Sequence, residues 1–402
     1  GITKEGAGTW TLSGASTYTG ATTINAGTLS VSSLANGGSN SNLGAATADA
    51  SNLIINGGTL KYTGTDVTID RLFTIGANGA TVDASGASGT LAFGNTSTLA
   101  TQSSGTTRTL TLTGSGMASL ASIVPNYLTN ATAITKTGAG TWILSGTNTY
   151  TGATTINAGT LSVSSLANGG SASNIGQSVN TAGYLVLGGG TLKYTGTDTT
   201  IDRAFTITNS TTGTFEVATA GVSLTISGSA ASSTGALTKT GVGTLVLSGS
   251  NAYSGLTTIS DGTLKLGAAG GATNTPLGTV GSGTTVASGA TLDLNGYTLG
   301  TAEALTLSGT GYSSAGALTN SSATTATYSG LITLGANATI KASSGNIVLS
   351  NAGTITGATY TLTLDGTATA SSLASIVGTT TGGITKEGAG TWTLSGASTY
   401  TG

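Results

Sequence analysis

Apolar residues along this chain alternate with hydroxyl residues in short runs of three to five positions. Examples are Trp10 and Leu12, Leu29 and Val31, Leu110 and Leu112, and Leu362 and Leu364. A period of two residues is typical of a β-strand with one buried face. No stretch keeps a helical period for three turns, so the pattern predicts an all-β fold.

Turn-forming residues separate these runs. Each run is bounded by Gly, Asn, Asp or Ser, and these residues favour the tight corners that positive φ angles produce. Short strands between frequent corners suit a coil in which each turn stacks on the one before, so that inward Leu, Ile, Val and Ala form one column. The sequence therefore predicts a β-helix (β-solenoid) of about 20 coils, at roughly 20 residues per coil.

A long exact repeat joins the two ends of the chain. Residues 1–20, GITKEGAGTWTLSGASTYTG, recur without change at residues 383–402, an offset of 382. We interpret residues 1–382 as one tandem repeat unit of a continuous solenoid and residues 383–402 as the start of the next, identical unit. No signal peptide begins the chain, and we expect export signals, anchors and further units outside it.

A weaker repeat lies inside this unit, with sub-repeats starting near residues 1, 133 and 236. GAGTW begins at Gly6, Gly138 and Gly388, and GVGTL begins at Gly241. Between the first two copies the offset of 132 holds through GTLKYTGTD and IDR, which predicts repeated structure in register. The structural signature of the repeat comprises Gly6, Gly8, Trp10, Leu12, Gly14, Gly138, Gly140, Trp142, Leu144, Gly146, Gly241, Gly243, Leu245, Gly390 and Trp392.

The segment GAGTWTLSGASTYTGATTINAGTLSV closely resembles the passenger-associated transport repeat of bacterial autotransporters, also called the autotransporter-associated β-strand repeat. The matching residues are Gly6, Gly8, Trp10, Leu12, Gly14, Tyr18, Gly20, Thr23, Ile24, Gly27, Thr28 and Leu29. The third copy carries Leu245 in place of Trp, which keeps an apolar residue inward. The resemblance implies a right-handed parallel β-helix that forms part of an autotransporter passenger, located outside the cell or on the bacterial cell surface.

Composition excludes several kinds of function. Charged residues make up 6% of the chain and sum to a net charge of −2, so no basic stripe is present to bind nucleic acid or an anionic membrane. The absence of Cys and His excludes disulfides, thiolate nucleophiles, an imidazole base and conventional zinc sites. No apolar run approaches the roughly 18 residues of a membrane span. We expect no catalytic residue, no cofactor, no metal site and no membrane insertion of this segment.

The densest charge lies in a corner that occurs twice. It comprises Lys61, Asp66, Asp70 and Arg71, repeated as Lys193, Asp198, Asp202 and Arg203. We interpret it as a structural ion-pair corner that holds the coil in register. A calcium site is the alternative, because carboxylates and loop carbonyls are hard ligands, but the sequence lacks the Gly-rich nonapeptide of calcium-binding β-rolls.

Other candidate sites have simpler structural interpretations. The remaining carboxylates are scattered singly along the chain, which argues against the paired acids of a polysaccharide-active enzyme. Repeated aromatic residues such as Trp10, Trp142 and Tyr150 are favoured as core residues over platforms for sugar rings. Thr pairs such as Thr9 and Thr11 resemble the hydroxyl arrays of ice-binding solenoids, but Thr is abundant throughout the sequence.

The main functional hypothesis is an extracellular structural protein that forms a stiff tandem-repeat fibre, sheath or spacer on a bacterial surface. Its partners are then adjacent copies of the same unit, with lateral contacts between rods. The alternative is an adhesin that binds glycans or neighbouring cells through an exposed face of the solenoid. An ice-binding solenoid and a polysaccharide-active enzyme are remote alternatives, and an enzyme is not expected.

Overall fold

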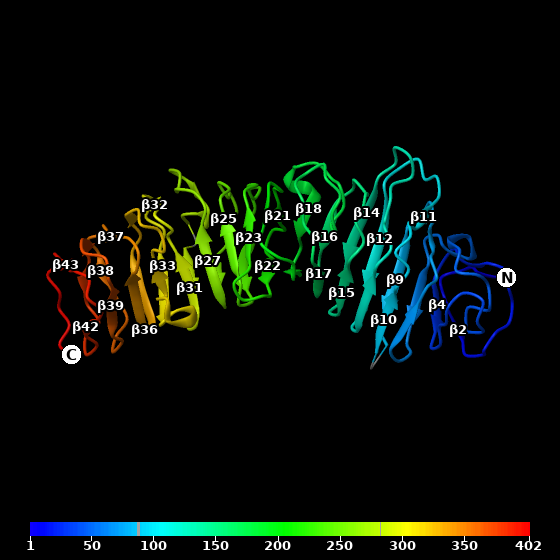
Figure 1. Cartoon of the computed structure of the whole chain (residues 1–402), viewed down its shortest axis with the longest axis horizontal. Helices are drawn as coiled ribbons and strands as arrows, with labels where there is room; N and C mark the ends of the chain where they lie inside the picture. The colour runs from blue at the N-terminus through cyan, green and yellow to red at the C-terminus, as the bar shows by residue number, and fades with distance from the viewer. Residues whose placement is uncertain (87–88, 282) are drawn as a thin grey trace. The chain divides into compact units, whose positions relative to one another are not determined.

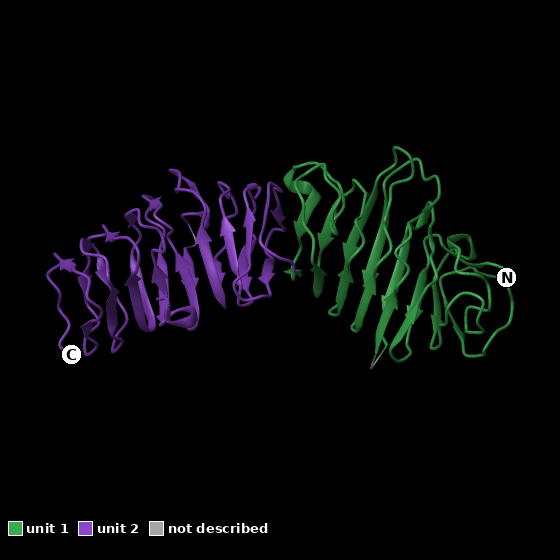
Figure 2. Ribbon diagram, viewed as in Figure 1, with its two compact units in different colours: residues 1–195 green, residues 196–402 purple. Residues whose placement is uncertain are grey.

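The computed structural model describes residues 1–86, 89–281 and 283–402. Among these residues it contains β-strands and three short 3-10 helices but no α-helix, which confirms the all-β prediction. The chain divides into two compact units, residues 1–195 and 196–402, shown in green and purple in Figure 2. Each unit is a stack of parallel strands, and the chain is a parallel β-solenoid of about 16 turns.

The strands of unit 1 run from blue to green in Figure 1, with the 3-10 helices η1 (Ala50–Asn52) and η2 (Ala182–Tyr184) between them. They are β1 (Ile2–Lys4), β2 (Thr9–Leu12), β3 (Thr22–Ile24), β4 (Thr28–Val31), β5 (Leu53–Ile55), β6 (Thr59–Tyr62), β7 (Val67–Ile69), β8 (Thr74–Ile75), β9 (Ala80–Ala84), β10 (Thr90–Phe93), β11 (Ala100–Thr101), β12 (Arg108–Thr113), β13 (Met117–Leu120), β14 (Thr132–Lys136), β15 (Thr141–Leu144), β16 (Thr154–Ile156), β17 (Thr160–Val163), β18 (Leu185–Leu187) and β19 (Thr191–Tyr194).

These strands form three parallel sheets. Sheet A has the order β1-β3-β5-β8-β11, sheet B the order β2-β4-β6-β9-β12-β14-β16-β18, and sheet C the order β7-β10-β13-β15-β17-β19. Consecutive strands therefore lie in different sheets, and each strand pairs with strands of the turns before and after it. This is the topology of a solenoid, and it follows from corners placed every few residues.

Unit 2 begins at residue 196 and contains the 3-10 helix η3 (Tyr312–Ser314). Its strands are β20 (Thr199–Ile201), β21 (Thr206–Ile207), β22 (Thr212–Val217), β23 (Ser223–Ile226), β24 (Ala236–Thr240), β25 (Thr244–Leu247), β26 (Thr257–Ile259), β27 (Gly262–Leu266), β28 (Asn274–Thr275), β29 (Gly278–Thr279), β30 (Thr284–Val286), β31 (Ala290–Asp293), β32 (Thr298–Leu299), β33 (Leu305–Gly309), β34 (Leu318–Thr319), β35 (Ala326–Tyr328), β36 (Ile332–Ala342), β37 (Ile347–Leu349), β38 (Thr354–Ile355), β39 (Leu362–Gly366), β40 (Ser371–Leu373), β41 (Ile376–Val377), β42 (Ile384–Lys386) and β43 (Trp392–Leu394).

Parallel pairing also dominates unit 2. One ladder runs β20-β23-β25-β27-β31-β34 and a second runs β22-β24-β26-β30-β33-β36-β39-β42, while the long strand β36 pairs with both β33 and β34. A third ladder has the order β32-β35-β37-β40-β43, and β38 pairs with β41. The short hairpin β28-β29 is antiparallel and lies in an excursion from the coil.

The turns are longer than the sequence pattern suggested, so the count of about 20 coils was too high and the chain makes about 16 turns. In sheet B, Thr9 pairs with Thr28, whereas Thr28 pairs with Thr59, a considerably longer step along the chain. The extra residues form surface excursions, such as residues 32–52 between β4 and β5. Excursions interrupt the strand pattern without adding a turn, and for that reason strand spacing alone overestimates the count.

The second copy of the repeat is rotated by one face relative to the first. In the first copy, the ITK strand β1 belongs to sheet A and the TWTL strand β2 belongs to sheet B. In the second copy, the corresponding strands β14 and β15 belong to sheets B and C. The offset between the two copies is therefore not a whole number of turns. Equivalent side chains of the two copies consequently face different sides of unit 1.

The core is a column of aliphatic side chains stacked in register. On β12, Leu110 and Leu112 are fully buried, while the alternating residues Thr109, Thr111 and Thr113 are only partly buried and lie outward. Leu110 pairs with Ala80 on one side and Ile134 on the other, so that inward residues of successive turns contact one another. Each buried Leu or Ile contributes roughly 1.5–3 kcal/mol, which explains how a chain with so few charges and no disulfide folds.

Aromatic side chains widen this column at particular turns. Phe73 and Phe93 meet edge to face at 5.4 Å in unit 1, and Phe205 and Phe215 meet at 5.2 Å in unit 2. Trp142 on β15 is 1% exposed, and its indole Nε1–H donates to the carbonyl of Thr113 at 2.9 Å. Buried rings bring large apolar area, and the polar edge of the indole is satisfied.

We predict that Trp142→Ala lowers the free energy of unfolding by about 3–5 kcal/mol, because it leaves a large cavity in a packed turn. Trp10→Ala is the matched control, since Trp10 holds the same repeat position but is 48% exposed. It should cost less than about 1 kcal/mol. Guanidinium titrations followed by circular dichroism measure both losses, and equal losses for the two variants would contradict the assignment of Trp142 to the core.

Candidate functional site

The signature glycines allow close stacking of the turns. Gly138 has φ of 68° and Gly241 has φ of 75°, values in the left-handed region that favours glycine. A Cβ added at Gly140 would overlap the carbonyl oxygen of Gly116 on the preceding turn. At Gly243 it would lie 2.5 Å from Cγ1 of Val217. These positions are therefore structural, and a side chain would separate neighbouring turns.

The aromatic position of the signature is buried wherever turns lie on both sides. Trp142 and Leu245 lie inside the column, and Leu245 is fully buried although it replaces Trp. Among the described strands, β2 pairs only with β4 and β43 only with β40, so Trp10 is exposed and Trp392 is half-buried. Burial of the two interior copies leaves them unavailable as platforms for sugar rings.

The repeated tyrosines anchor the excursions of the coil. Tyr150 and Tyr253 are fully buried, and their hydroxyls hydrogen-bond Oγ1 of Thr154 at 2.6 Å and of Thr257 at 2.8 Å. A Cβ at Gly176 would lie 2.6 Å from the ring of Tyr150, so the excursion lies directly on the ring. These contacts support a structural role for the tyrosines.

The first charged corner binds backbone groups of an excursion. Arg71 is 2% exposed, and its guanidinium donates from Nε to the Ala35 carbonyl at 2.8 Å and from Nη1 to the Ala46 carbonyl at 3.0 Å. Oδ1 of Asp70 accepts the Gly37 N–H at 2.7 Å. Sequence analysis predicted ion pairs here, but Arg71 and Asp70 instead hold residues 35–46 against the coil.

The other two residues of this corner contact the neighbouring turns. Lys61 lies 3.9 Å from Asp83 on the next strand of sheet B, and Oδ1 of Asp66 accepts the Thr90 N–H at 2.6 Å. Within the described part of the chain, no ion pair joins Lys61 to Asp66 or to Asp70. The corner thus fixes register through turn-to-turn contacts rather than through pairs among its own members.

In the second copy of the corner, Arg203 is as buried as Arg71, and Oδ1 of Asp198 accepts the Ser223 N–H at 2.9 Å. Lys193 on β19 and Asp202 are half-buried. The arginine thus keeps an interior position in both copies. Among the described residues, no group of three or more His, Cys, Asp or Glu side chains lies close enough to hold a metal ion.

Lysines and aspartates pair directly across neighbouring strands on the outer faces. Lys61 is the register partner of Asp83, Lys265 of Asp293, and Lys341 of Asp365, with Nζ to Oδ2 distances of 3.9, 3.5 and 3.0 Å. In a parallel stack, like charges at one position would lie about 4.8 Å apart and repel. Alternating the sign gives attraction instead, and the Lys341 ammonium contributes to lowering the pKa of Asp365.

The lysine of each ITK segment forms a clip that the sequence analysis missed. Lys136 is fully buried, and its ammonium donates to the carbonyls of Thr137 at 2.7 Å, Gly138 at 2.8 Å and Ala158 at 3.0 Å. Burial lowers the pKa of Lys136 to about 8, whereas its three carbonyl acceptors favour the charged form. The clip ties the corner of one turn to the next turn.

The same clip recurs at the start of each sub-repeat. Lys4 donates to carbonyls of residues 5, 6 and 26, and Lys239 to carbonyls of residues 240, 241 and 261. Lys386 donates to carbonyls of residues 387 and 388. The signal in the sequence is the recurrence of TK before the glycine signature, in a chain with only 11 basic residues.

A buried carboxyl group lies in the core of unit 2. Glu303 is 0% exposed, Thr284 donates its hydroxyl to Oε1 at 2.6 Å, and Oγ1 of Thr275 lies 3.3 Å from Oε2. Thr275 also lies 3.1 Å from the carbonyl of Gly278, the acceptor that the corresponding Ser173 uses at Gly176. With the carboxyl protonated, Oγ1 of Thr275 accepts from Glu303 and donates its own proton to Gly278, so that each contact is a separate hydrogen bond. Burial raises the pKa of Glu303 to about 7.

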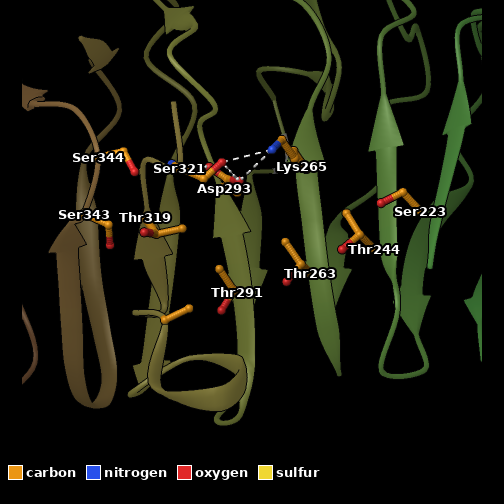
Figure 3. Close-up of a pocket in the computed structure, with 11 residues that line it drawn as sticks. Ser223, Thr244, Thr263, Lys265, Thr291, Asp293, Thr319, Ser321, Ser343 and Ser344 are labelled. Atoms are coloured by element: carbon orange, nitrogen blue, oxygen red, sulfur yellow. Dashed lines mark hydrogen bonds and ion pairs between the residues drawn. The ribbon is translucent and has the colours of Figure 1, made fainter. Parts of the chain in front are cut away.

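A shallow groove of about 310 Å³ on the outer face of unit 2 is a candidate binding surface (Figure 3). Its lining consists of Ser223, Thr244, Thr263, Lys265, Thr291, Asp293, Ala315, Thr319, Ser321, Ser343 and Ser344. Ser223, Thr244, Thr263 and Thr291 are register partners on β23, β25, β27 and β31, so they form one row across four strands. Strand spacing sets this row at about 4.8 Å per residue.

The groove holds few reactive groups. Oδ2 of Asp293 accepts the Ser321 hydroxyl at 2.5 Å and faces Nζ of Lys265 at 3.5 Å, and Oδ1 accepts the Asn295 N–H at 2.9 Å. These contacts give both oxygens of the Asp293 carboxylate structural partners. Hydroxyl rows of this kind donate to and accept from neutral polar ligands such as sugars.

Comparison with known proteins places the chain in a recognised group. The family model described as the passenger-associated-transport-repeat matches residues 2–31, 134–163, 237–266 and 384–402. Over 260 residues the chain is 43% identical to a protein named "Adhesin BmaC autotransporter" from Brucella suis biovar 1 (strain 1330). The match covers 64% of this chain but only 7% of that relative. No solved structure matches the chain.

The fold and the repeat define a class, the parallel β-solenoids whose turns are built from tandem strand repeats. Within that class, the chain is an autotransporter-type passenger region with passenger-associated transport repeats, and the resemblance noted in the sequence is confirmed. No helix among the described residues is both long enough and apolar enough to cross a membrane.

We predict that Lys136→Met destabilises the chain by about 2 kcal/mol, because three partly buried carbonyls lose a charged donor. Lys61→Met is the control, since the partly exposed pair with Asp83 contributes about 0–1 kcal/mol. Denaturant unfolding measures both variants. A Lys136→Met chain as stable as wild type would contradict the clip.

Glu303 makes the stability of unit 2 depend on pH. Its pKa rises from about 4.5 in the unfolded chain to about 7 in the folded chain, so the folded state binds the proton more tightly. The protonated carboxyl therefore contributes fully to the free energy of unfolding below pH 4.5, and this contribution is lost as the pH rises to about 7. The loss is on the order of 3 kcal/mol.

Glu303→Gln should remove this dependence, because the amide stays neutral at every pH. We expect the variant to unfold at a higher temperature than wild type at pH 8, with the difference vanishing near pH 4. Thermal unfolding between pH 4 and pH 8 measures the effect. Glu5→Gln, at an exposed position, should keep the wild-type profile. A flat wild-type profile would contradict the buried neutral carboxyl.

Proposed function

We propose that this chain is a structural spacer segment of an autotransporter passenger at the bacterial surface. The observation that carries the proposal is the burial of the repeated aromatic and charged residues within each unit, where they hold turns together. Trp142, Tyr150, Lys136 and Arg71 all bind other parts of the solenoid. A side chain used in this way maintains the scaffold rather than contacting a ligand.

We also propose that the chain is displayed outside the cell and has a non-catalytic role. Similarity to an autotransporter named as an adhesin supports a passenger that is displayed outside the cell, and it points to a role other than catalysis. Because the chain spans a small fraction of that relative, the activity of the whole protein is a separate matter. The carboxyl groups described above are occupied by structural hydrogen bonds, which agrees with a scaffold.

Tandem continuation of the solenoid is the proposed partner interaction. Residues 383–402 repeat residues 1–20, and the strands β42 and β43 form at the same positions of the motif as β1 and β2. A following unit would therefore continue the coil with the pairing already seen between β1 and β3. In this arrangement the spacer becomes a stiff fibre of identical units.

A second candidate function is adhesion to glycans through the groove of unit 2. Its row of hydroxyls from Ser223 to Thr291 matches the hydrogen-bonding pattern of a neutral sugar chain. The similar autotransporter from Brucella suis is named as an adhesin, which favours this candidate as well. The row lacks an exposed aromatic ring, which sugar-binding sites commonly provide, so we rank adhesion second.

Two experiments separate these functions. A protein that carries two copies of residues 1–382 in tandem should form particles longer than a single copy by about 4.8 Å per added turn, as measured by negative-stain electron microscopy. On a glycan array, the purified chain should give no signal above that of a Thr244→Val/Thr263→Val variant.

Separate globular particles from the two-copy protein would overturn the spacer proposal. Glycan binding that is lost in the Thr244→Val/Thr263→Val variant would instead establish adhesion at the groove. Both substitutions lie on the outer face and replace a hydroxyl by a methyl group, so the fold should tolerate them.

A further inference from the structure

A buried arginine in unit 1 is only partly used by the protein. Arg108 begins β12, points inward and is 2% exposed. Its Nη2 donates to Oγ of Ser104 at 2.9 Å, and its guanidinium lies 5.5 Å from the centre of the Tyr127 ring. Its Nε and Nη1 have no hydrogen-bond partner among the described residues. Two donor groups of a buried cation are therefore unsatisfied.

Arg71 shows what this solenoid does with a buried arginine that has only a structural role. It is equally buried, and Nε, Nη1 and Nη2 all donate to carbonyls of one excursion, with the Gly44 carbonyl 2.9 Å from Nη2. The chain can thus satisfy a guanidinium completely with its own backbone. At Arg108 it does not, although a buried donor left without an acceptor costs roughly 1–3 kcal/mol.

A third unsatisfied polar atom lies on the adjacent turn. Thr132 on β14 is the register partner of Arg108 and is also buried, and its Oγ1 has no hydrogen-bond partner in the described part of the chain. In-register neighbours of parallel strands lie about 4.8 Å apart, so Thr132 and Arg108 are side-by-side residues of adjacent turns. An unsatisfied hydroxyl and two unsatisfied guanidinium donors therefore belong to neighbouring buried side chains.

The charge of Arg108 is not compensated, since no carboxylate among the described residues forms an ion pair with it. Burial accordingly lowers the pKa of Arg108, and only Tyr127 acts in the opposite direction. A bound anion would supply acceptor atoms for the unsatisfied donors and negative charge to balance the guanidinium. Water would supply acceptor atoms but no negative charge.

We propose that Arg108 and Thr132 form a binding site for a small oxyanion, such as the carboxylate of an acidic sugar or a free carboxylate or sulfate. The planar guanidinium suits such groups because its donors match the spacing of two oxygens. Ser104, whose hydroxyl accepts from Arg108, lies in the segment 102–107, where Ser103, Gly105, Thr106 and Thr107 are exposed to solvent, so the site lies close to the surface.

The site is independent of the proposed spacer function and of the groove in unit 2. The chain contains three arginines, Arg71, Arg108 and Arg203, so the NMR signals of arginine side chains can report on the site directly. In a ¹⁵N-labelled sample each contributes one Nε–H signal, and the Arg108→Gln variant assigns the signal of Arg108. Acetate, sulfate and glucuronate are titrated against chloride at constant ionic strength, with glucose as the neutral control.

We expect the Arg108 signal to shift saturably with the oxyanions and not with glucose, while the signals of Arg71 and Arg203 stay in place. Tighter binding of glucuronate than of acetate identifies an acidic sugar as the ligand, and equal binding identifies a free oxyanion. The unfolding temperature should also rise with oxyanion concentration in wild type. Arg108→Gln should abolish this rise.

Arg71→Gln is the matched control, because it removes an equally buried arginine that is already satisfied. It should lower stability but keep the response to oxyanions. An Arg108 signal that does not move, or three arginine signals that move together, would mean that water occupies the free donors and would overturn the proposal. An oxyanion response that persists in Arg108→Gln would overturn it as well.

Discussion

Parallel pairing of each strand with the strands of the turns before and after it is the constraint on which this structure depends. Pairing in register places equivalent positions of successive turns about 4.8 Å apart. The side chain at each position must therefore be able to lie next to the side chain at the paired position of the adjacent turn. Inward positions are therefore aliphatic, as with Leu110 between Ala80 and Ile134. Outward charges alternate in sign, as with Lys265 and Asp293, because like charges at this distance would repel.

Turns of unequal length make register a second problem, which buried polar side chains solve. Excursions lengthen some turns without adding strands to the ladder, as between Thr28 and Thr59, and the backbone of an excursion needs partners. Arg71 binds the carbonyls of one excursion, and Lys136 connects a corner to the turn that follows. A misplaced turn would leave these cations without acceptors, so the clips select one register as well as stabilising it.

Two buried polar residues differ from those that hold the turns together. Most buried polar groups bind backbone and hold the turns together, which suits a passenger whose surface is rich in hydroxyls and poor in charge. Glu303 and Arg108 differ, because one is a carboxyl that burial keeps protonated and the other is a cation with unsatisfied donors. The carboxyl of Glu303 contacts Thr284 and Thr275, whereas Arg108 makes one side-chain hydrogen bond, to the nearby Ser104. Substitutions at these two positions are therefore more informative than substitutions of the repeated glycines, which would only push turns apart.

Local pattern alone determined much of this protein, because alternation of apolar and hydroxyl residues reports which side of a strand is buried. The strand pairs around Trp142 and Leu144, the glycine corners and the solenoid class all follow from it. Only the tertiary structure decided the turn count, the rotation of the second repeat by one face, and the partners of Lys61, Arg71 and Lys136. These depend on which distant turn lies alongside, since excursions of variable length separate sequence distance from position in the stack.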